Sequence, residues 1–379
     1  MYFQQRSDFG QTVTAVQNIT TTTGQQEFRI PLQRTFPIEA IQIQVEMNVS
    51  GVAATLNVDG LQNILKRVNL TIADGVRTRT VVDCSGPDLL EFQVQTRGFI
   101  DADTTAALGG QLVNSANAVA VYGNNTTGIK RLTYLIDCAP TQIMDPLSSM
   151  MLLPVTRYPS DPILALTIAG ANDIDKNAAI TFAATNIVVT VSVYRRFVNV
   201  DQWAYIDWDL TTQDTPLPSA VSDFRIELLT PGSYFGTLYK CYAATSGAGI
   251  PLVRYDITNP QSPGIRIESL NVNFRRFTFR MLKALNEASR GYAFLPGSAI
   301  QFFPASFYSD FLTDRLTDAT ELGSVLDANI PVNSGATVNL MLAPSSTAGG
   351  VPTVVQSGSF LRQLHWRAYG NLSSLKGVR

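Results

Sequence analysis

The chain of 379 residues is too long for one compact core and has the length of two ordinary domains. Its formal net charge of −2 gives no electrostatic case for coating nucleic acid, and without a run of about 18 apolar residues no membrane-spanning helix is expected. Charged residues make up only 15% of the chain, against roughly 25% in an average soluble domain. A surface so poor in charge indicates that partner molecules cover part of it.

Two features of the sequence bear on the cellular compartment. Residues 1–12 contain no apolar stretch after Arg6, so no secretory signal is expected. The three cysteines, Cys84, Cys138 and Cys241, are odd in number and far apart. This spacing favours buried, reduced thiols over a disulfide framework or a zinc site.

The first strong strand signals come from residues 38–51 and 64–82. Apolar and polar side chains alternate in residues 38–51, which predicts a strand with one buried face. Two β-rich runs in residues 64–82 flank Ala73-Asp74-Gly75, a turn sequence typical of a hairpin.

A short helix and a long loop follow the predicted hairpin. Ser85 is followed three residues later by Asp88, a capping-box pattern, and Pro87 suits the first helical turn. Residues 101–128 are small, polar and rich in glycine, which predicts a long surface excursion. Strand patterns then resume over residues 129–140, 163–170 and 178–197.

The order of features begins again after residues 201–220, whose prolines and polar side chains we interpret as a linker. Residues 222–244 open the second half much as residues 26–47 open the first. A strand pattern in residues 358–371 closes the chain, as a similar pattern in residues 185–203 closes the first half. The two closing strand patterns therefore predict that the chain contains two barrels.

These patterns predict an all-β chain with long loops and one or two short helices. Each half has about eight strands, which is typical of β-sandwiches and of jelly rolls. The predicted parts are an N-terminal arm at residues 1–11, a first β unit at 12–200, a linker at 201–220 and a second β unit at 221–379.

Catalytic chemistry has little support in the sequence. His365 is the only histidine, and its place in a strand pattern between Leu364 and Trp366 favours a structural role. The chain contains no nucleophile elbow, no Walker pattern and no dinucleotide-binding glycine pattern. We therefore expect no enzyme, no catalytic residue, no cofactor site and no metal site.

An acidic and aromatic cluster lies at the junction of the two halves. Aromatic rings stack on sugars and paired carboxylates can act as acid and base, so such a cluster is a candidate carbohydrate-binding or glycosidase site. We favour the interpretation that its aromatic side chains join the two barrels. The cluster consists of Asp201, Trp203, Tyr205, Asp207, Trp208 and Asp209.

Three weaker patterns favour ordinary structural roles. Asp173 and Asp175 begin a sequence that resembles a calcium loop, but its glycine and closing glutamate are missing, so a turn is expected. The sequons at residues 18–20 and 69–71 would matter only in a secreted protein. Arginines at strand positions are expected to form ion pairs at an interface and not a nucleic-acid groove. These arginines are Arg67, Arg195, Arg196, Arg275, Arg276 and Arg280.

The order of segments in the first half carries a resemblance to a known family. Residues 27–51 lead into residues 61–80, then into a capped helix at 85–92 and a long loop; residues 131–140, 150–155, 163–170 and 187–197 follow in order. This order, over nearly the whole chain, resembles that of the double jelly-roll major capsid proteins of tailless, membrane-containing bacteriophages in the PRD1-adenovirus lineage.

The resemblance implies a structural role in a virion. Such proteins form pseudo-hexagonal homotrimers that tile an icosahedral shell, since three chains with two barrels each place six similar units around one axis. The implied partners are further copies of the chain, penton or minor capsid proteins and an underlying membrane, with no specific nucleic-acid binding and synthesis in the host cytoplasm. Residues 98–128 and 283–298 would lie at the outer face or at trimer contacts, and residues 1–10 would point inward.

Two alternatives predict a different use of the acidic and aromatic cluster. A β-sandwich spike, receptor-binding or carbohydrate-binding protein would expose Trp203 and Trp208 to solvent. A carbohydrate-active enzyme would hold two of Asp201, Asp207 and Asp209 across a cleft.

Overall fold

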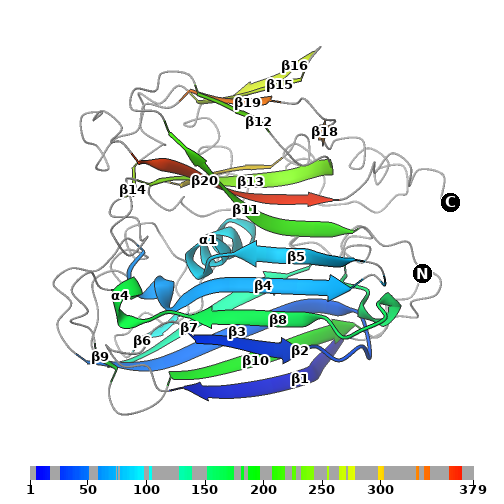
Figure 1. Ribbon diagram of the computed structural model, residues 1–379, viewed down its shortest axis with the longest axis vertical. Helices are drawn as coiled ribbons and strands as arrows, with labels where there is room; N and C mark the ends of the chain where they lie inside the picture. The colour runs from blue at the N-terminus through cyan, green and yellow to red at the C-terminus, as the bar shows by residue number, and fades with distance from the viewer. Residues whose placement is uncertain are drawn as a thin grey trace. The chain divides into compact units, whose positions relative to one another are not determined.

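The computed structural model divides the chain into two compact units (Figure 1). The first unit comprises Met1–Val113 and Asn117–Ile206, and the second comprises Asn114–Ala116 and Asp207–Arg379. Strands dominate the described part of both units. The structure describes residues 6–17, 26–50, 59–73, 75, 77–97, 102–104, 128–138, 152–174, 181–182, 187–196, 207–217, 224–227, 232–242, 254–255, 264–269, 272–277, 298–302, 330–332, 337–341 and 358–368.

The first sheet of the first unit is antiparallel and has the strand order β1-β10-β3-β7-β6. Val191 of β10 lies opposite Val13 of β1 and Ile43 of β3, which places the last long strand of the unit between its first and third. The predicted alternation over residues 38–51 is confirmed, since Ile41 and Val45 are fully buried and face the core. The strands are β1 (Arg6–Gln17), β3 (Ile38–Ser50), β6 (Ala102–Thr104), β7 (Gly128–Asp137) and β10 (Ile187–Arg196), with β9 (Thr181–Phe182) paired to the end of β3.

The second sheet of the first unit has the order β2-β8-β4-β5. Its β4–β5 hairpin confirms the predicted turn, and Gly75 adopts a φ of 94°, a left-handed conformation that glycine reaches without strain. Leu70 and Leu164 lie opposite each other and are fully buried, so this sheet also turns one apolar face to the core. The strands are β2 (Gln26–Pro31), β4 (Leu65–Ala73), β5 (Thr78–Cys84) and β8 (Ile163–Ile168).

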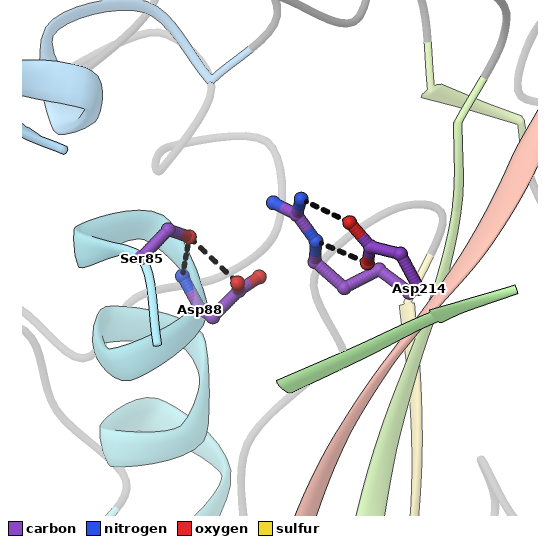
Figure 2. Close-up of polar contacts among 4 residues, drawn as sticks. Ser85, Asp88 and Asp214 are labelled. Atoms are coloured by element: carbon purple, nitrogen blue, oxygen red, sulfur yellow. Dashed lines mark hydrogen bonds and ion pairs between the residues drawn. The ribbon is translucent and has the colours of Figure 1, made fainter. Parts of the chain in front are cut away.

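Helix α1 (Gly86–Arg97) closes one edge of the first sheet. The Ser85 hydroxyl accepts a hydrogen bond from the Asp88 backbone N–H at 3.2 Å and donates one to Asp88 Oδ2 at 2.6 Å, which confirms the predicted helix start (Figure 2). Gln93 Oε1 accepts a hydrogen bond from the Leu135 backbone N–H, so the helix satisfies an edge group of β7. The shorter helices are η1 (Gly60–Ile64), η3 (Val155–Arg157) and α4 (Ala171–Ile174).

The described strands of the second unit also form two sheets. In one of them β20 (Phe360–Ala368) pairs with β11 (Trp208–Pro216) on one side and with β13 (Gly232–Tyr242) on the other. Strands β14 (Arg254–Tyr255), β17 (Ser298–Phe302) and β18 (Ile330–Val332) pair with β13. The other sheet has the order β12-β19-β15-β16, with bounds β12 (Phe224–Glu227), β15 (Gly264–Ser269), β16 (Val272–Phe277) and β19 (Thr337–Met341).

Eight strands of each unit occupy the same places when they are numbered in chain order. In the first unit these are β1, β2, β3, β4, β5, β7, β8 and β10; in the second they are β11, β12, β13, β15, β16, β17, β19 and β20. In both units one sheet reads first-eighth-third-sixth and the other reads second-seventh-fourth-fifth. The sheet-closing patterns seen in the sequence are therefore equivalent strands, β10 and β20.

The structure corrects the predicted arm and linker. Residues 6–11 of the predicted arm belong to β1, and residues 208–216 of the predicted linker form β11. Threonine and glutamine are frequent in both strands, and neither strand has the long apolar alternation of β3 or β10. Pairing with β10 and β20 holds them in the sheets. Within the described residues, no helix combines the length and apolar character needed to cross a membrane.

Candidate functional site

His365 lies in the middle of β20 and is buried. Its Nδ1 lies 3.0 Å from the Thr237 hydroxyl on β13, within hydrogen-bond distance. Burial, with the positive charge of Arg367 nearby, lowers the pKa of His365 to about 3. The imidazole is therefore neutral at physiological pH, and its burial beside Thr237 suits the structural role that the sequence favours.

The acidic and aromatic cluster is not an exposed sugar-binding platform in its described part. Trp208 is only 3% exposed, and the Asp209 carboxylate is fully buried. Both oxygens of Asp209 accept hydrogen bonds from Arg367 at 2.7 Å. Asp207 is exposed. This burial corrects the alternative that requires a solvent-facing Trp208; Asp201, Trp203 and Tyr205 lie outside the described residues.

Asp173 belongs to the short helix α4 and not to a calcium-binding loop. The sequence predicts a turn at this position. Its Oδ2 accepts a hydrogen bond from the Gly170 backbone N–H, and its Oδ1 lies 2.7 Å from Lys66 Nζ. Asp175 is outside the described residues. In the part of the chain that the structure describes, no group of three or more histidine, cysteine or acidic side chains could hold a metal ion.

The three cysteines are free and buried, as the sequence predicts. Burial raises the pKa of the Cys138 thiol well above its usual value, and burial also raises the pKa of the Cys241 thiol. Thiols held in this way are poor nucleophiles, so the cysteines contribute to packing.

Ion pairs within the chain hold most of the described strand arginines. In five arginines the same two nitrogens, Nε and Nη2, donate to one carboxylate. The pairs are Arg67–Asp83, Arg131–Glu46, Arg196–Glu39, Arg362–Asp214 and Arg367–Asp209. For Arg67 and Arg196 this corrects the expectation of ion pairs at an interface. The side chains of Arg275 and Arg276, and all of Arg280, lie outside the described residues.

Arg195 is the exception among the arginines predicted from sequence. Its side chain is only 2% exposed, and its Nη1 donates to the Phe36 carbonyl at 2.8 Å. Nε and Nη2 are both buried without a hydrogen-bond partner. Burial lowers the pKa of Arg195, while Asp161 acts in the opposite direction. The alternation of Val189, Val191 and Val193 along β10 continues to Arg195 and is the sequence signal for its inward position.

The shared strand order identifies the architecture of both units. Two sheets with the order first-eighth-third-sixth and second-seventh-fourth-fifth form a jelly roll of eight strands. The chain has a double jelly-roll fold. The sequence alone leaves the β-sandwich and the jelly roll open, and the strand order decides for the jelly roll.

Solved structures of viral capsid proteins share the double jelly roll. The crystal structure of the STIV major capsid protein (MCP) aligns with a TM-score of 0.60 at 14% identity, over 97% of this chain and 100% of that chain. A chain from the atomic structure of Sulfolobus Turreted Icosahedral Virus gives 0.57 at 14% identity, over 97% and 93%. A chain of the PBCV-1 virus capsid gives 0.59 at 12% identity, over 97% and 95%. No protein-family model and no curated protein matches the sequence.

The double jelly roll confirms the predicted fold class and the fold implied by the resemblance. Its described residues also give the earlier site candidates structural roles. His365, Asp209 and Asp173 are each held by neighbouring side chains or backbone groups. Arg195 has two buried N–H groups without a hydrogen-bond partner, and the buried Lys130 Nζ has none either.

Proposed function

We propose that this double jelly-roll protein is a viral major capsid protein with a structural and non-enzymatic role. The observation that carries the proposal is the repeated strand order, matched over 97% of the chain by the STIV MCP. The burial of Trp208 and the pairing of Asp209 with Arg367 support this role over a carbohydrate-binding one, because neither group is offered to a ligand.

The proposed assembly is a homotrimer with pseudo-hexagonal outline that tiles an icosahedral shell. Two rolls of equivalent topology in each of three chains give six similar units around one axis, the arrangement that a hexagon requires. Charged residues form only 15% of the chain, which suits a protein whose surface is largely covered by neighbouring subunits.

The proposal places the protein in the virion capsid after synthesis in the host cytoplasm. Its further partners are neighbouring trimers, penton or minor capsid proteins and an underlying membrane, which the resemblance implies. Residues 98–128 and 283–298 are the proposed outer loops or trimer contacts, and the segment before β1 is the proposed inward-pointing terminus.

The solution mass of the purified full chain tests the proposal. Light scattering should find a stable species of three times 41.3 kDa, about 124 kDa. Electron microscopy of the same sample at higher concentration should then show hexagonal particles and ordered sheets. A homogeneous 41.3 kDa monomer at micromolar concentration would contradict the assembly.

A further inference from the structure

One end of the first roll is formed by the β2–β3, β4–β5 and β7–β8 connections. The Leu32 backbone N–H donates to the Pro162 carbonyl, which joins the β2–β3 connection to residues 152–162 of the β7–β8 connection. The β4–β5 hairpin turn contacts the same segment, because a Cβ built at Gly75 would lie 3.9 Å from Pro159 Cγ. The three connections therefore form one continuous surface of the roll.

Arginine side chains gather at this end of the roll, which we call the arginine end. The end of β10 belongs to it, since the Arg196 backbone N–H donates to the Pro37 carbonyl. In the part of the chain that the structure describes, arginines outnumber acids here. The arginines are Arg34, Arg77, Arg79, Arg157, Arg195 and Arg196, and the acids are Glu39, Asp137 and Asp161.

Two of the three acids at the arginine end are bound to arginines. Asp161 Oδ1 lies 3.2 Å from Arg34 Nε, and Glu39 Oε1 lies 3.0 Å from Arg196 Nη2. Arg34, Arg77 and Arg157 are all exposed. The arginine end is therefore a positively charged surface on a chain whose formal net charge is −2.

The opposite end of the roll does not repeat this excess of arginine. There the cationic side chains of the first residues of β4 and β7 face acids across short distances. The ion pairs are Lys66–Asp173 at 2.7 Å, Arg67–Asp83 at 2.7 Å and Arg131–Glu46 at 2.5 Å. Positive charge is thus concentrated at one end of the first roll.

The arginine end also exposes an aromatic side chain. Phe36 is 38% exposed and is one of two large hydrophobic residues exposed in the described part of the chain. Its carbonyl accepts a hydrogen bond from Arg195 Nη1 at 2.8 Å, so the buried arginine holds the backbone of the connection that carries Phe36. An aromatic side chain among cationic ones is typical of surfaces that bind the interface of an anionic membrane.

We propose that the arginine end of the first roll binds the headgroups of anionic lipids at a membrane surface. The guanidinium groups of Arg34, Arg77 and Arg157 contact lipid phosphates, and the Phe36 ring enters the interface between headgroups and acyl chains. The inference rests on the proposed function, because it names the surface and the lipid chemistry of the membrane contact.

The topology of the first roll agrees with this orientation. Strand β1 begins at Arg6, opposite Arg196, so the proposed inward-pointing terminus leaves from the arginine end. Strand β7 begins at Gly128, opposite Val49 near the far end of β3, so the proposed outer loop at residues 98–128 attaches to the opposite end. The arginine end and the proposed outer loop therefore lie at opposite ends of the roll.

A lipid surface fits the arginine end better than a nucleic acid. Arginine binds phosphate in both, but the interface of a membrane also accepts the Phe36 ring, which a duplex backbone does not. The net charge of −2 opposes close wrapping of the chain by a polyanion. Binding to duplex DNA is the competing outcome of the test.

The test measures co-sedimentation of the full chain with phosphatidylcholine vesicles that contain or lack phosphatidylglycerol. The wild type should bind only the anionic vesicles, and less tightly as salt is added. The double variant Arg77→Gln with Arg157→Gln should bind roughly 30-fold more weakly. Arg77→Lys with Arg157→Lys should keep most of the affinity, because the charge remains. Phe36→Ser should weaken binding also at high salt, where charges are screened.

A matched control removes the same charge at the opposite end of the roll. Arg67→Gln with Arg131→Gln lowers the net charge by the same amount, and both arginines pair with acids on the surface. This variant should bind anionic vesicles as the wild type does. Urea unfolding of every variant shows whether a loss of binding reflects a loss of folding.

Three results would overturn the inference. They are no binding of the wild type to phosphatidylglycerol vesicles, an equal loss in the Arg67 and Arg131 control, and a double Arg77 and Arg157 variant that loses affinity for duplex DNA but not for vesicles. A trimer that ignores the vesicles would leave the proposed function intact. Vesicle binding by a chain that stays monomeric would instead contradict the proposed function.

Discussion

Arg367 and Asp209 face each other across β20 and β11, and each of two Arg367 nitrogens lies 2.7 Å from a different Asp209 oxygen. Asp209 is fully buried and Arg367 is 8% exposed. Five positions along the same strands, Arg362 binds Asp214 with the same two nitrogens, at 2.7 and 2.8 Å, but on a more exposed surface. The same arginine–carboxylate geometry therefore occurs twice on one strand pair, once buried and once exposed.

Asp209→Ala should destabilise the chain far more than Asp214→Ala. The first change leaves a buried guanidinium without its partner, which costs about 3–5 kcal/mol, whereas an exposed pair contributes about 0–1 kcal/mol. Urea unfolding of the two variants measures the difference. The double variant Asp209→Leu with Arg367→Met should regain much of the loss, because no buried charge remains. Equal effects of the two single variants would contradict this account.

The free energy of unfolding should depend on pH through His365. The pKa of His365 is about 3 in the folded chain and 6.5 in its ordinary state. Between these values the unfolded chain binds more protons, so His365 contributes stability fully above pH 6.5 and loses it as pH falls. The wild type should lose up to about 1.4 kcal/mol per pH unit more than His365→Gln. Denaturant titrations at pH 7.5 and 5.5 measure this loss. An equal change in the free energy of unfolding for both proteins between the two pH values would refute the prediction.

Gly86→Ala should destabilise the first roll, although alanine is the better helix former. A Cβ at Gly86 would lie 2.2 Å from the Leu65 carbonyl oxygen and 2.9 Å from Leu65 Cβ. Relieving such an overlap moves α1 or β4, at a cost of about 1–3 kcal/mol. Ser85→Ala, which removes the helix cap alone, should cost about 1 kcal/mol. A gain in thermal stability for Gly86→Ala would show that helix propensity prevails and that the close approach is relaxed.

The three cysteines should resist thiol reagents until the chain unfolds. Cys84, Cys138 and Cys241 are buried, and the raised pKa values of Cys138 and Cys241 keep those two thiols protonated near neutral pH. An aromatic disulfide reagent should therefore release little product from the native chain and three equivalents in denaturant. Rapid release of one equivalent from the native chain would identify an accessible thiol and contradict the packing described here.

Apolar alternation is sufficient to predict the strands that face the core on one side. Ile41, Ile43 and Val45 mark β3, and Val189 and Val191 mark β10, because each sheet buries one face. The same rule misses Trp208–Pro216, whose threonines and acids form a strand only because β20 pairs with it. The insertion of the eighth strand between the first and third is set by contacts far apart in sequence, which local patterns do not contain.

Only part of the surroundings of Arg195 could be predicted from the sequence. Arg195 and Arg196 are adjacent, so the strand pattern places them on opposite faces, and the parity of Val193 assigns Arg195 to the inside. The sequence does not tell which of them has an acid across the strand. That Arg196 meets Glu39 while the fork of Arg195 meets no acid depends on the register of β10 and on the path of residues 32–37.

The place of β10 and β20 has a consequence for synthesis. A ribosome that has released residues up to Arg196 has delivered every described strand of the first roll, which can then close while translation continues. In the second roll, β11 and β13 both need Phe360–Ala368, which is synthesised much later than either strand, to pair between them. Until then their edges are open to other nascent chains, so truncation or slow translation before residue 360 should favour aggregation over assembly.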